Sequence, residues 1–199
     1  MKRATAFAAG LVLLVSGCST GGVPTPSFAP VEPGAVVAAR KQAGIADCPE
    51  SSTTVAARAG GLPDLVLECL GGDSTVRLAG LRGKPMVINL WAQWCEPCRE
   101  ESPYLRDYAK AASRKVLLLG VNYNDPRPEL AVEFASLVGW KYPQLADQEL
   151  RLATAMPVSG LPLTLFVDPD GKVVHRVAGK LRSYDELLQL TEDHLGVTL

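Results

Sequence analysis

The chain has 199 residues, of which 47% are hydrophobic and 21% are charged, and its formal net charge at pH 7 is −1. Its basic residues do not cluster, so the charge pattern gives no support for nucleic-acid binding. The last 150 or so residues of the chain suit a single domain with one hydrophobic core.

The N-terminus has the layout of a secretion signal. Two basic residues precede an uncharged stretch over residues 4–15, which has the length of a signal-peptide core and is too short to span a membrane comfortably. Ser16, Gly17 and Cys18 follow, in a pattern that resembles a bacterial lipobox. We therefore predict a lipoprotein signal peptide over residues 1–17 and acyl chains on Cys18 that hold the protein on a membrane. The alternative is an ordinary cleaved signal followed by an unrelated cysteine.

The segment after Cys18 has the composition of a linker. Residues 19–35 are rich in Gly, Pro, Ser and Thr and carry one charge, at Glu32. Such a segment has no sustained hydrophobic period and behaves as a flexible chain. We predict a lipid anchor and flexible tether over residues 18–45 and a globular domain over residues 46–199. The alternative for residues 36–42 is a short helix.

The globular part alternates between strand and helix patterns. Apolar runs predict strands over residues 64–68, 74–78, 85–91, 116–122, 163–167 and 173–177, with Gly-rich or Asp-Pro-Asp-Gly turns inside the first and last pairs. Helices are predicted to begin near Pro97, at Pro128 and after Ser183, where Glu186 completes a capping box. This order indicates an α/β fold.

Two cysteines lie three positions apart in the run Trp94-Cys95-Glu96-Pro97-Cys98, between a buried strand and a helix. At the start of a helix, free backbone N–H groups and the helix dipole stabilise a thiolate, which is the species that attacks disulfides. The motif predicts a redox-active dithiol. We expect Cys95 to be the exposed sulfur that exchanges with a client disulfide, and Cys98 to resolve the mixed disulfide.

Cys48 and Cys69 remain once Cys18 is assigned to lipidation and the other two cysteines to the redox pair. In an oxidising compartment we predict a structural disulfide between them, which closes a loop of roughly 20 residues. The alternative is two inert buried thiols. We predict no metal site, because His175 and His194 are the only histidines and neither stands at ligand spacing from another candidate ligand.

The dithiol region resembles the thioredoxin superfamily and, more closely, its TlpA/ResA-like branch of extracytoplasmic thiol:disulfide oxidoreductases. The resemblance covers roughly residues 60–196 and implies a thioredoxin-like α/β fold, with a central mixed sheet flanked by helices and an N-terminal β-hairpin extension. The residues that carry it are Trp94, Cys95, Pro97, Cys98, Glu101, Pro103 and Gly160-Leu161-Pro162.

The resemblance also implies how a client binds. Pro162 is expected to follow a cis peptide bond and to lie opposite Cys95, while Leu161 offers its backbone groups to a bound peptide. The alternative for Pro162 is a trans proline in an ordinary loop. The other positions expected to contact the client are Trp94, Glu96 and Pro97.

Two carboxylates near the cysteines bear on the chemistry. Glu101 lies three residues after Cys98 on the same helix face, and burial there would raise its pKa and suit it to shuttle protons. The alternative is a surface glutamate. Asn89 stands six positions before Cys95, where thioredoxins have a buried aspartate, so Glu101 would have to serve instead.

Glu96 disfavours a neighbouring thiolate, which predicts a raised pKa for Cys95 and a reducing couple.

Together these features predict an enzyme, a membrane-anchored extracytoplasmic thiol:disulfide oxidoreductase with a reducing bias and no cofactor. The resemblance implies clients among secreted proteins or apocytochrome c, and a membrane thiol donor of the CcdA or DsbD type. We expect a monomer on the outer face of a bacterial cell membrane. The alternatives are a disulfide-forming oxidase, a peroxiredoxin-like peroxidase and a binding module that merely retains the motif.

Overall fold

The computed structural model describes residues 32–112 and 114–199 of the chain. The predicted signal peptide, the predicted lipidation site Cys18 and the larger part of the predicted tether lie outside these residues. Within the described residues, no helix is both long enough and apolar enough to cross a membrane.

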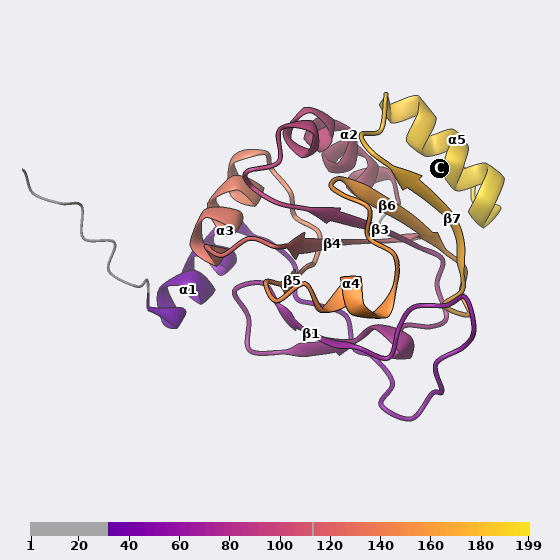
Figure 1. Cartoon of the computed structure of the whole chain (residues 1–199). Helices are drawn as coiled ribbons and strands as arrows, with labels where there is room; N and C mark the ends of the chain where they lie inside the picture. The colour runs from indigo at the N-terminus through magenta and orange to yellow at the C-terminus, as the bar shows by residue number, and fades with distance from the viewer. Residues whose placement is uncertain (1–31, 113) are drawn as a thin grey trace, which may run out of the picture. The chain divides into compact units, whose positions relative to one another are not determined.

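Seven strands form one mixed sheet. They are β1 (Val66–Cys69), β2 (Thr75–Arg77), β3 (Met86–Trp91), β4 (Leu117–Tyr123), β5 (Gln144–Asp147), β6 (Leu163–Val167) and β7 (Val173–Ala178). Their order across the sheet is β2-β1-β5-β4-β3-β6-β7 (Figure 1). The pairs β3–β4 and β4–β5 are parallel, and the other neighbouring strands are antiparallel.

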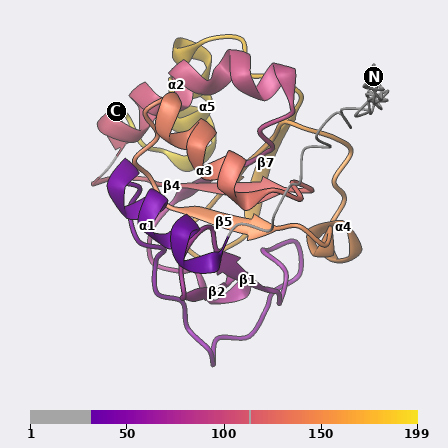
Figure 2. The same cartoon turned by 90° about the vertical axis from the view of Figure 1, so that its left-hand side faces the viewer.

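Helices cover both faces of this sheet. They are α1 (Pro33–Ala43), α2 (Glu96–Ala112), α3 (Pro128–Leu137), α4 (Arg151–Ala155) and α5 (Tyr184–Leu195), with a short 3₁₀ turn over Leu78–Gly80. In both views α2 and α5 lie together on one side of the central strands, and α4 lies on the other side (Figures 1 and 2).

The central strand β3 contributes side chains to two hydrophobic clusters, one on each face of the sheet. Successive side chains of a strand face opposite sides of the sheet. Ile88 and Leu90 belong to the hydrophobic cluster on the α4 side, whereas Val87 and Trp91 belong to the cluster that includes α2, α3 and α5. Asn89 therefore faces the α2 side, where it is fully buried. This alternation places a polar amide beneath the helix that carries the dithiol.

The predicted thioredoxin-like α/β fold is confirmed: the mixed sheet is flanked by helices, and the β1–β2 hairpin adds to the sheet beyond β5. Each strand expected from an apolar run is present within a few residues of its predicted bounds. The predicted cap of α5 is also present, because Ser183 Oγ accepts a hydrogen bond of 3.0 Å from the N–H of Glu186.

The C-terminal end of the predicted tether over residues 18–45 is helical rather than flexible, because α1 forms there, over a slightly longer range than the alternative of a short helix over residues 36–42. Val36 and Ala43 are buried, and Arg40, which is also buried, lies between them on the same helical face. The Arg40 guanidinium pairs with Asp47. A cation in the middle of the buried stripe hides its helical period, which is why the sequence pattern indicates a linker.

The strand β5 and the helix α4 have no counterpart in the prediction. Only two of the four residues of β5 are apolar, so no hydrophobic run marks this strand. Its buried polar ends are held by tertiary hydrogen bonds instead. Gln144 Oε1 accepts from Trp91 Nε1 at 2.9 Å, and the Asp147 carboxylate accepts from the N–H groups of Arg151 and Leu152 at 2.9 and 2.8 Å. The second set of bonds also fixes the start of α4.

Candidate dithiol active site

The loop from β3 to α2 carries the two predicted redox cysteines. Cys95 directly precedes the first residue of α2, and Cys98 lies within its first turn. The two form a disulfide, with 5.3 Å between their Cα atoms. The backbone N–H of Cys98 points to Cys95 Sγ at 3.3 Å. A sulfur in this position receives a free N–H group of the helix, as a thiolate at a helix start requires.

The structure differs from the expectation that Cys95 is an exposed sulfur. Its side chain is only 4% exposed, and Cys98 is completely buried. Both sulfurs are turned towards each other in the disulfide, which leaves Cys95 with a small accessible edge. Next to it, Trp94 is 52% exposed at the rim of the site, whereas Trp91 is fully buried in the core. Glu96 and Pro97 are exposed on the first turn of α2.

Glu101 is fully buried beneath the same helix, so it is not a surface glutamate. Its Oε1 accepts a hydrogen bond of 2.8 Å from Asn89 Nδ2, and its Oε2 accepts one of 2.8 Å from the backbone N–H of Leu181. Asn89 Nδ2 also donates to Thr164 Oγ1 at 3.1 Å. Two donors from two separate elements therefore hold the carboxylate in one position.

The surroundings of Glu101 bring its pKa close to neutral pH. Burial raises its pKa from 4.5 to about 7, against the opposing effects of the hydrogen bonds from Leu181 and Asn89 and of the charge of Lys180. Lys180 in turn pairs with Glu100. Residues three apart on a helix lie on the same face, so Glu101 shares a buried face of α2 with Cys98. It is thus equipped to take up and release a proton on the helix face that carries Cys98.

Pro162 follows a cis peptide bond from Leu161, so a trans proline at this position is excluded. The antiparallel pairing of β3 and β6 matches Leu90 with Leu163. Pro162, one residue before Leu163, therefore lies beside the C-terminal end of β3, from which the cysteine loop leaves. Pro162 itself is buried, and Leu161 is half-buried. This places the predicted peptide-binding residues at the same end of the sheet as the dithiol.

A polar cluster after β4, which was not predicted from the sequence, also supports the cysteine loop. The buried Asp125 carboxylate accepts hydrogen bonds from the N–H of Gln93 at 2.9 Å and from Asn122 Nδ2 at 3.1 Å. Trp94 Nε1 donates to the carbonyl of Asn124 at 3.0 Å. Because β3 and β4 run parallel, the residues after each strand meet at one edge of the sheet. The signal available in the sequence was that polar residues directly follow the apolar run of β4.

Cys48 and Cys69 are joined in a second disulfide, with 5.9 Å between their Cα atoms. This bridge fastens the segment after α1 to the last residue of β1, and it excludes the alternative of two free thiols. Elsewhere in the described ranges, no three His, Cys, Asp or Glu side chains are grouped so that they could hold a metal ion.

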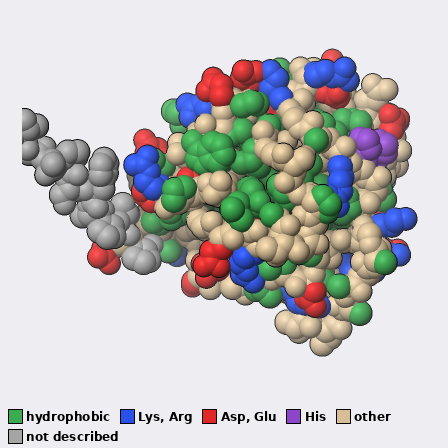
Figure 3. All heavy atoms as spheres, viewed as in Figure 1, with side chains coloured by type: hydrophobic (Ala, Val, Ile, Leu, Met, Phe, Trp, Pro, Cys, Tyr) green, Lys and Arg blue, Asp and Glu red, His purple; other side chains and the backbone are tan. Residues whose placement is uncertain are grey.

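The face seen in Figure 3 carries acidic and basic side chains around its edge and hydrophobic side chains towards its middle, over β4 and between α2 and α4. Charges of both signs are mixed on this face, in keeping with the net charge of −1. This face therefore has no extended basic surface of the kind that nucleic-acid binding requires.

Comparison with known proteins gives the same assignment. The AhpC/TSA family matches residues 61–176. ResA of Bacillus subtilis, a thiol-disulfide oxidoreductase, is 36% identical over 121 residues, which cover 60% of this chain and 66% of ResA. The solved structure of MTB DsbF in mixed oxidised and reduced forms is 32% identical with a TM-score of 0.57, over 63% of this chain and 91% of DsbF.

A third relative is Etrx1 of Streptococcus pneumoniae, described as an exposed lipoprotein thioredoxin. Its solved structure is 25% identical with a TM-score of 0.56, over 65% of this chain and 98% of Etrx1. The names of these relatives do not favour the peroxidase alternative, and the predicted resemblance is confirmed. The chain therefore belongs to the AhpC/TSA family, and within it to the thioredoxin-like thiol-disulfide oxidoreductases.

Proposed function

We propose that the chain is a membrane-anchored, extracytoplasmic thiol-disulfide reductase. The observation that carries this proposal is the position of Glu101, which is fully buried, lies three residues after Cys98 and has a pKa raised to about 7. A reducing cycle requires Cys98 to lose its proton inside an apolar site, and a nearby carboxylate of this proton affinity is a suitable acceptor.

The cycle starts from the reduced dithiol. The Cys95 thiolate attacks one sulfur of a client disulfide, forming a mixed disulfide and releasing the first client sulfur as a thiolate, which is then protonated. Cys98 gives its proton to Glu101 and attacks Cys95 Sγ. The Cys95–Cys98 disulfide forms, and the second client sulfur leaves and is protonated. Two electrons have then passed from the dithiol to the client.

Two residues support the reducing direction. Glu96 is the first residue of α2 and lies next to Cys95, where its negative charge disfavours the thiolate and so disfavours a strongly oxidising couple. Asn89 is a neutral amide at the position where thioredoxins have a buried aspartate, and it donates a hydrogen bond to Glu101, which is then the one carboxylate proposed to serve the dithiol. A disulfide-forming oxidase would instead need a strongly stabilised Cys95 thiolate.

The proposal extends to the location and partners of the enzyme. The lipobox-like sequence around Cys18 and the description of Etrx1 as an exposed lipoprotein support a lipid anchor on the outer face of a bacterial cell membrane. We propose that the protein acts as a monomer on secreted proteins or apocytochrome c. Each turnover leaves the dithiol oxidised, so a membrane thiol donor of the CcdA or DsbD type would have to reduce it.

A trapping experiment in a bacterial host tests this function. In the Cys98→Ala variant the mixed disulfide on Cys95 is not resolved, so client proteins should stay covalently attached and be released by dithiothreitol. The Cys95→Ala variant is the matched control and should trap nothing. In cells that lack the protein, a trapped client of a reductase accumulates as its disulfide. Accumulation of the reduced client would instead indicate an oxidase.

A fractionation experiment tests the location. The unchanged chain should sediment with membranes and the Cys18→Ala variant should not, because acyl chains attached to that cysteine are the proposed anchor. Release of both chains into the soluble fraction would contradict the lipid anchor while leaving the thiol chemistry untouched.

A further inference from the structure

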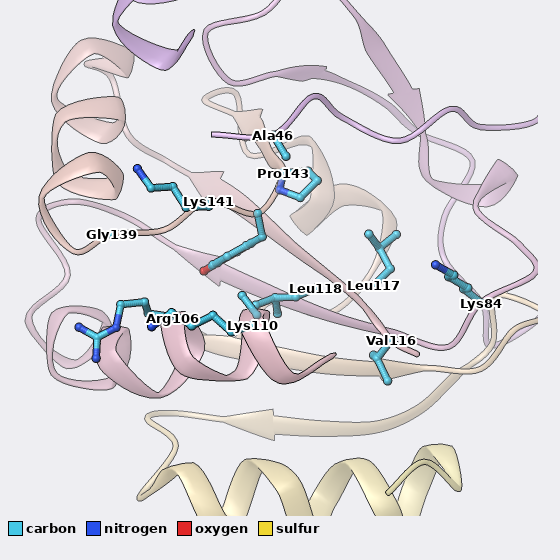
Figure 4. Close-up of a pocket in the computed structure, with 12 residues that line it drawn as sticks. Ala46, Lys84, Arg106, Lys110, Val116, Leu117, Leu118, Gly139, Lys141 and Pro143 are labelled. Atoms are coloured by element: carbon cyan, nitrogen blue, oxygen red, sulfur yellow. The ribbon is translucent and has the colours of Figure 1, made fainter. Parts of the chain in front are cut away.

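A groove of about 410 Å³ lies on the sheet at the end opposite to the dithiol. It runs over the first residues of β4, between α2 and the segment over residues 139–143 (Figure 4). The dithiol follows the C-terminal end of β3, and the parallel pairing matches the start of β3 with the start of β4. The groove therefore shares no residue with the candidate active site.

The groove exists because β5 begins late. Pairing of β4 with β5 starts at Gly120 and Gln144, so the first part of β4 has no strand on that side. Pro143 comes directly before β5 and has no N–H with which to extend the pairing towards Leu118. The N–H of Gly120 donates to the carbonyl of Pro143 at 3.0 Å. The N–H of Leu118, two residues earlier, points to the same side of β4, where pairing with β5 has not yet begun.

The floor of the groove is apolar. Val116, Leu118 and Tyr142 line it and are buried members of the core cluster beneath α2, and Ala109 of α2 packs against them. Apolar surface lining a concavity of this size is typical of sites for small ligands, which occupy roughly 300–1,000 Å³.

The rim of the groove is cationic. Lys84, Arg106, Lys110 and Lys141 line it, and none of the described residues that line it is acidic. Lys141 and Arg106 lie at one end and Lys84 at the other (Figure 4).

Within the described residues these cations are only partly neutralised. Arg106 and Lys110 share one carboxylate, that of Asp107, with bonds of 3.0 and 3.1 Å. Lys141 Nζ is bound by a neutral group, the carbonyl of Ala43. Lys84 has no ion pair in the described part of the chain. Four cations against one carboxylate leave three positive charges around an apolar floor.

We propose that this groove binds one molecule of an anionic amphiphile, an acyl chain with a carboxylate head. The chain would cover the floor formed by Val116 and Leu118. The head would lie at the end with Arg106 and Lys141, because that end holds more cations than the Lys84 end and a carboxylate binds a guanidinium in a bidentate manner. The site is independent of the redox function, since no reactive group of the dithiol site takes part.

Laurate, below its micelle concentration, is the probe. It is titrated into the full chain carrying Cys18→Ser, oxidised, and binding is followed by calorimetry and by amide chemical shifts in NMR spectra. We expect saturable binding at a ratio of one to one, with the largest shifts at Leu117, Leu118 and Gly139. Butyrate, which has the head without the long chain, and dodecyl maltoside, which has the chain without the charge, should bind at least tenfold more weakly.

Matched variants locate the site. Arg106→Gln with Lys141→Gln removes both cations of the end that would hold the head and should weaken laurate binding at least tenfold. Lys172→Gln with Arg58→Gln, which removes the same charge from a distant exposed surface, should leave it unchanged. Ala46→Trp fills the groove from its exposed edge and should abolish binding. Ala56→Trp, at an exposed position outside the groove, should not. Unchanged melting temperatures and unchanged dithiol reactivity show that the variants are folded.

Several results would overturn the proposal. These are shifts spread over the whole molecule, equal effects of the two double charge variants, equal binding of dodecyl maltoside, or normal laurate binding by Ala46→Trp. Binding to vesicles of anionic phospholipid without binding of dissolved laurate would also overturn it, because the rim would then be a membrane-contacting surface rather than a ligand site.

Discussion

Asn89 Nδ2 lies 2.8 Å from Glu101 Oε1 and donates a hydrogen bond to it beneath the dithiol helix. The amide belongs to β3 and the carboxylate to α2, so the bond joins the central strand to the helix that carries both cysteines. This hydrogen bond lowers the pKa of Glu101, but burial raises the pKa by more, so the resulting pKa is about 7. The pair thus provides one proton-accepting group, held in place by hydrogen bonds, beneath the helix of the dithiol.

Replacing Glu101 should slow the resolving step of the redox cycle. In Glu101→Gln the amide keeps the shape of the side chain and cannot accept the proton of Cys98, and loss of a general base typically costs about a hundredfold or more. In rapid-mixing measurements, the rate of client reduction should also lose its dependence on pH around 7. Glu133→Gln, at an exposed position on α3, is the control. A rate and pH profile that match the unchanged chain would exclude Glu101 as the base.

The buried Glu101 should make the oxidised fold less stable as the pH rises. Its pKa is about 7 in the folded chain and 4.5 ordinarily, so the folded state binds the proton more tightly than the unfolded state. This contribution to stability is fully present below pH 4.5 and is lost as the pH rises through 7. The free energy of unfolding should fall by roughly 3 kcal/mol between these limits.

Denaturant unfolding of the oxidised chain at about pH 5 and about pH 8 measures this effect. The Glu101→Gln variant should show a much smaller difference between the two conditions, because it has no group to titrate at this position. An equal difference in both proteins would mean that other groups cause it.

The positions of the main strands followed from their sequences because β3, β4 and β6 are apolar almost throughout and are buried on both faces. The strand β5 could not be predicted in this way. The burial of Gln144 and Asp147 depends on hydrogen bonds from Trp91 and from the start of α4, which only the folded chain brings together. Tertiary contacts, and not a local sequence pattern, determine where this strand forms.

The site shows the same division. The spacing of Cys95, Cys98 and Glu101 along one helix is local, so the sequence was sufficient to group them. In contrast, the contact between Gln93 and Asp125 spans 32 positions and depends on the parallel pairing of β3 and β4. No periodicity within either segment indicates that contact, and it was found only in the structure.

Removing the Asp125 carboxylate should loosen the cysteine loop. In Asp125→Ala the N–H of Gln93 and the amide of Asn122 lose their acceptor, and each unsatisfied group costs about 1–3 kcal/mol. We expect a lower free energy of unfolding and a slower reaction of the dithiol with a client disulfide. Asp193→Ala, at an exposed position of α5, should change neither. Unchanged stability in Asp125→Ala would show that water or other groups replace the carboxylate.

The Cys48–Cys69 bridge should stabilise the fold without tuning the redox pair. It joins positions 21 residues apart, and removing such a cross-link costs about 3 kcal/mol in the chain-entropy account. The Cys48→Ala, Cys69→Ala double variant should therefore unfold at lower denaturant concentration and keep the same Cys95/Cys98 reduction potential. A shifted potential would indicate that the second bridge takes part in the redox function.

The reduction potential of the Cys95/Cys98 couple tests the proposed function most directly. It is measured on the folded chain by equilibration with dithiothreitol or glutathione, with the Cys48–Cys69 bridge intact. A reductase with Glu96 beside Cys95 should give about −250 mV or lower, in the range of reducing thioredoxins. A value near −120 mV, which is that of a strong disulfide-forming oxidant, would contradict the proposed direction and assign the same dithiol to the formation of disulfides.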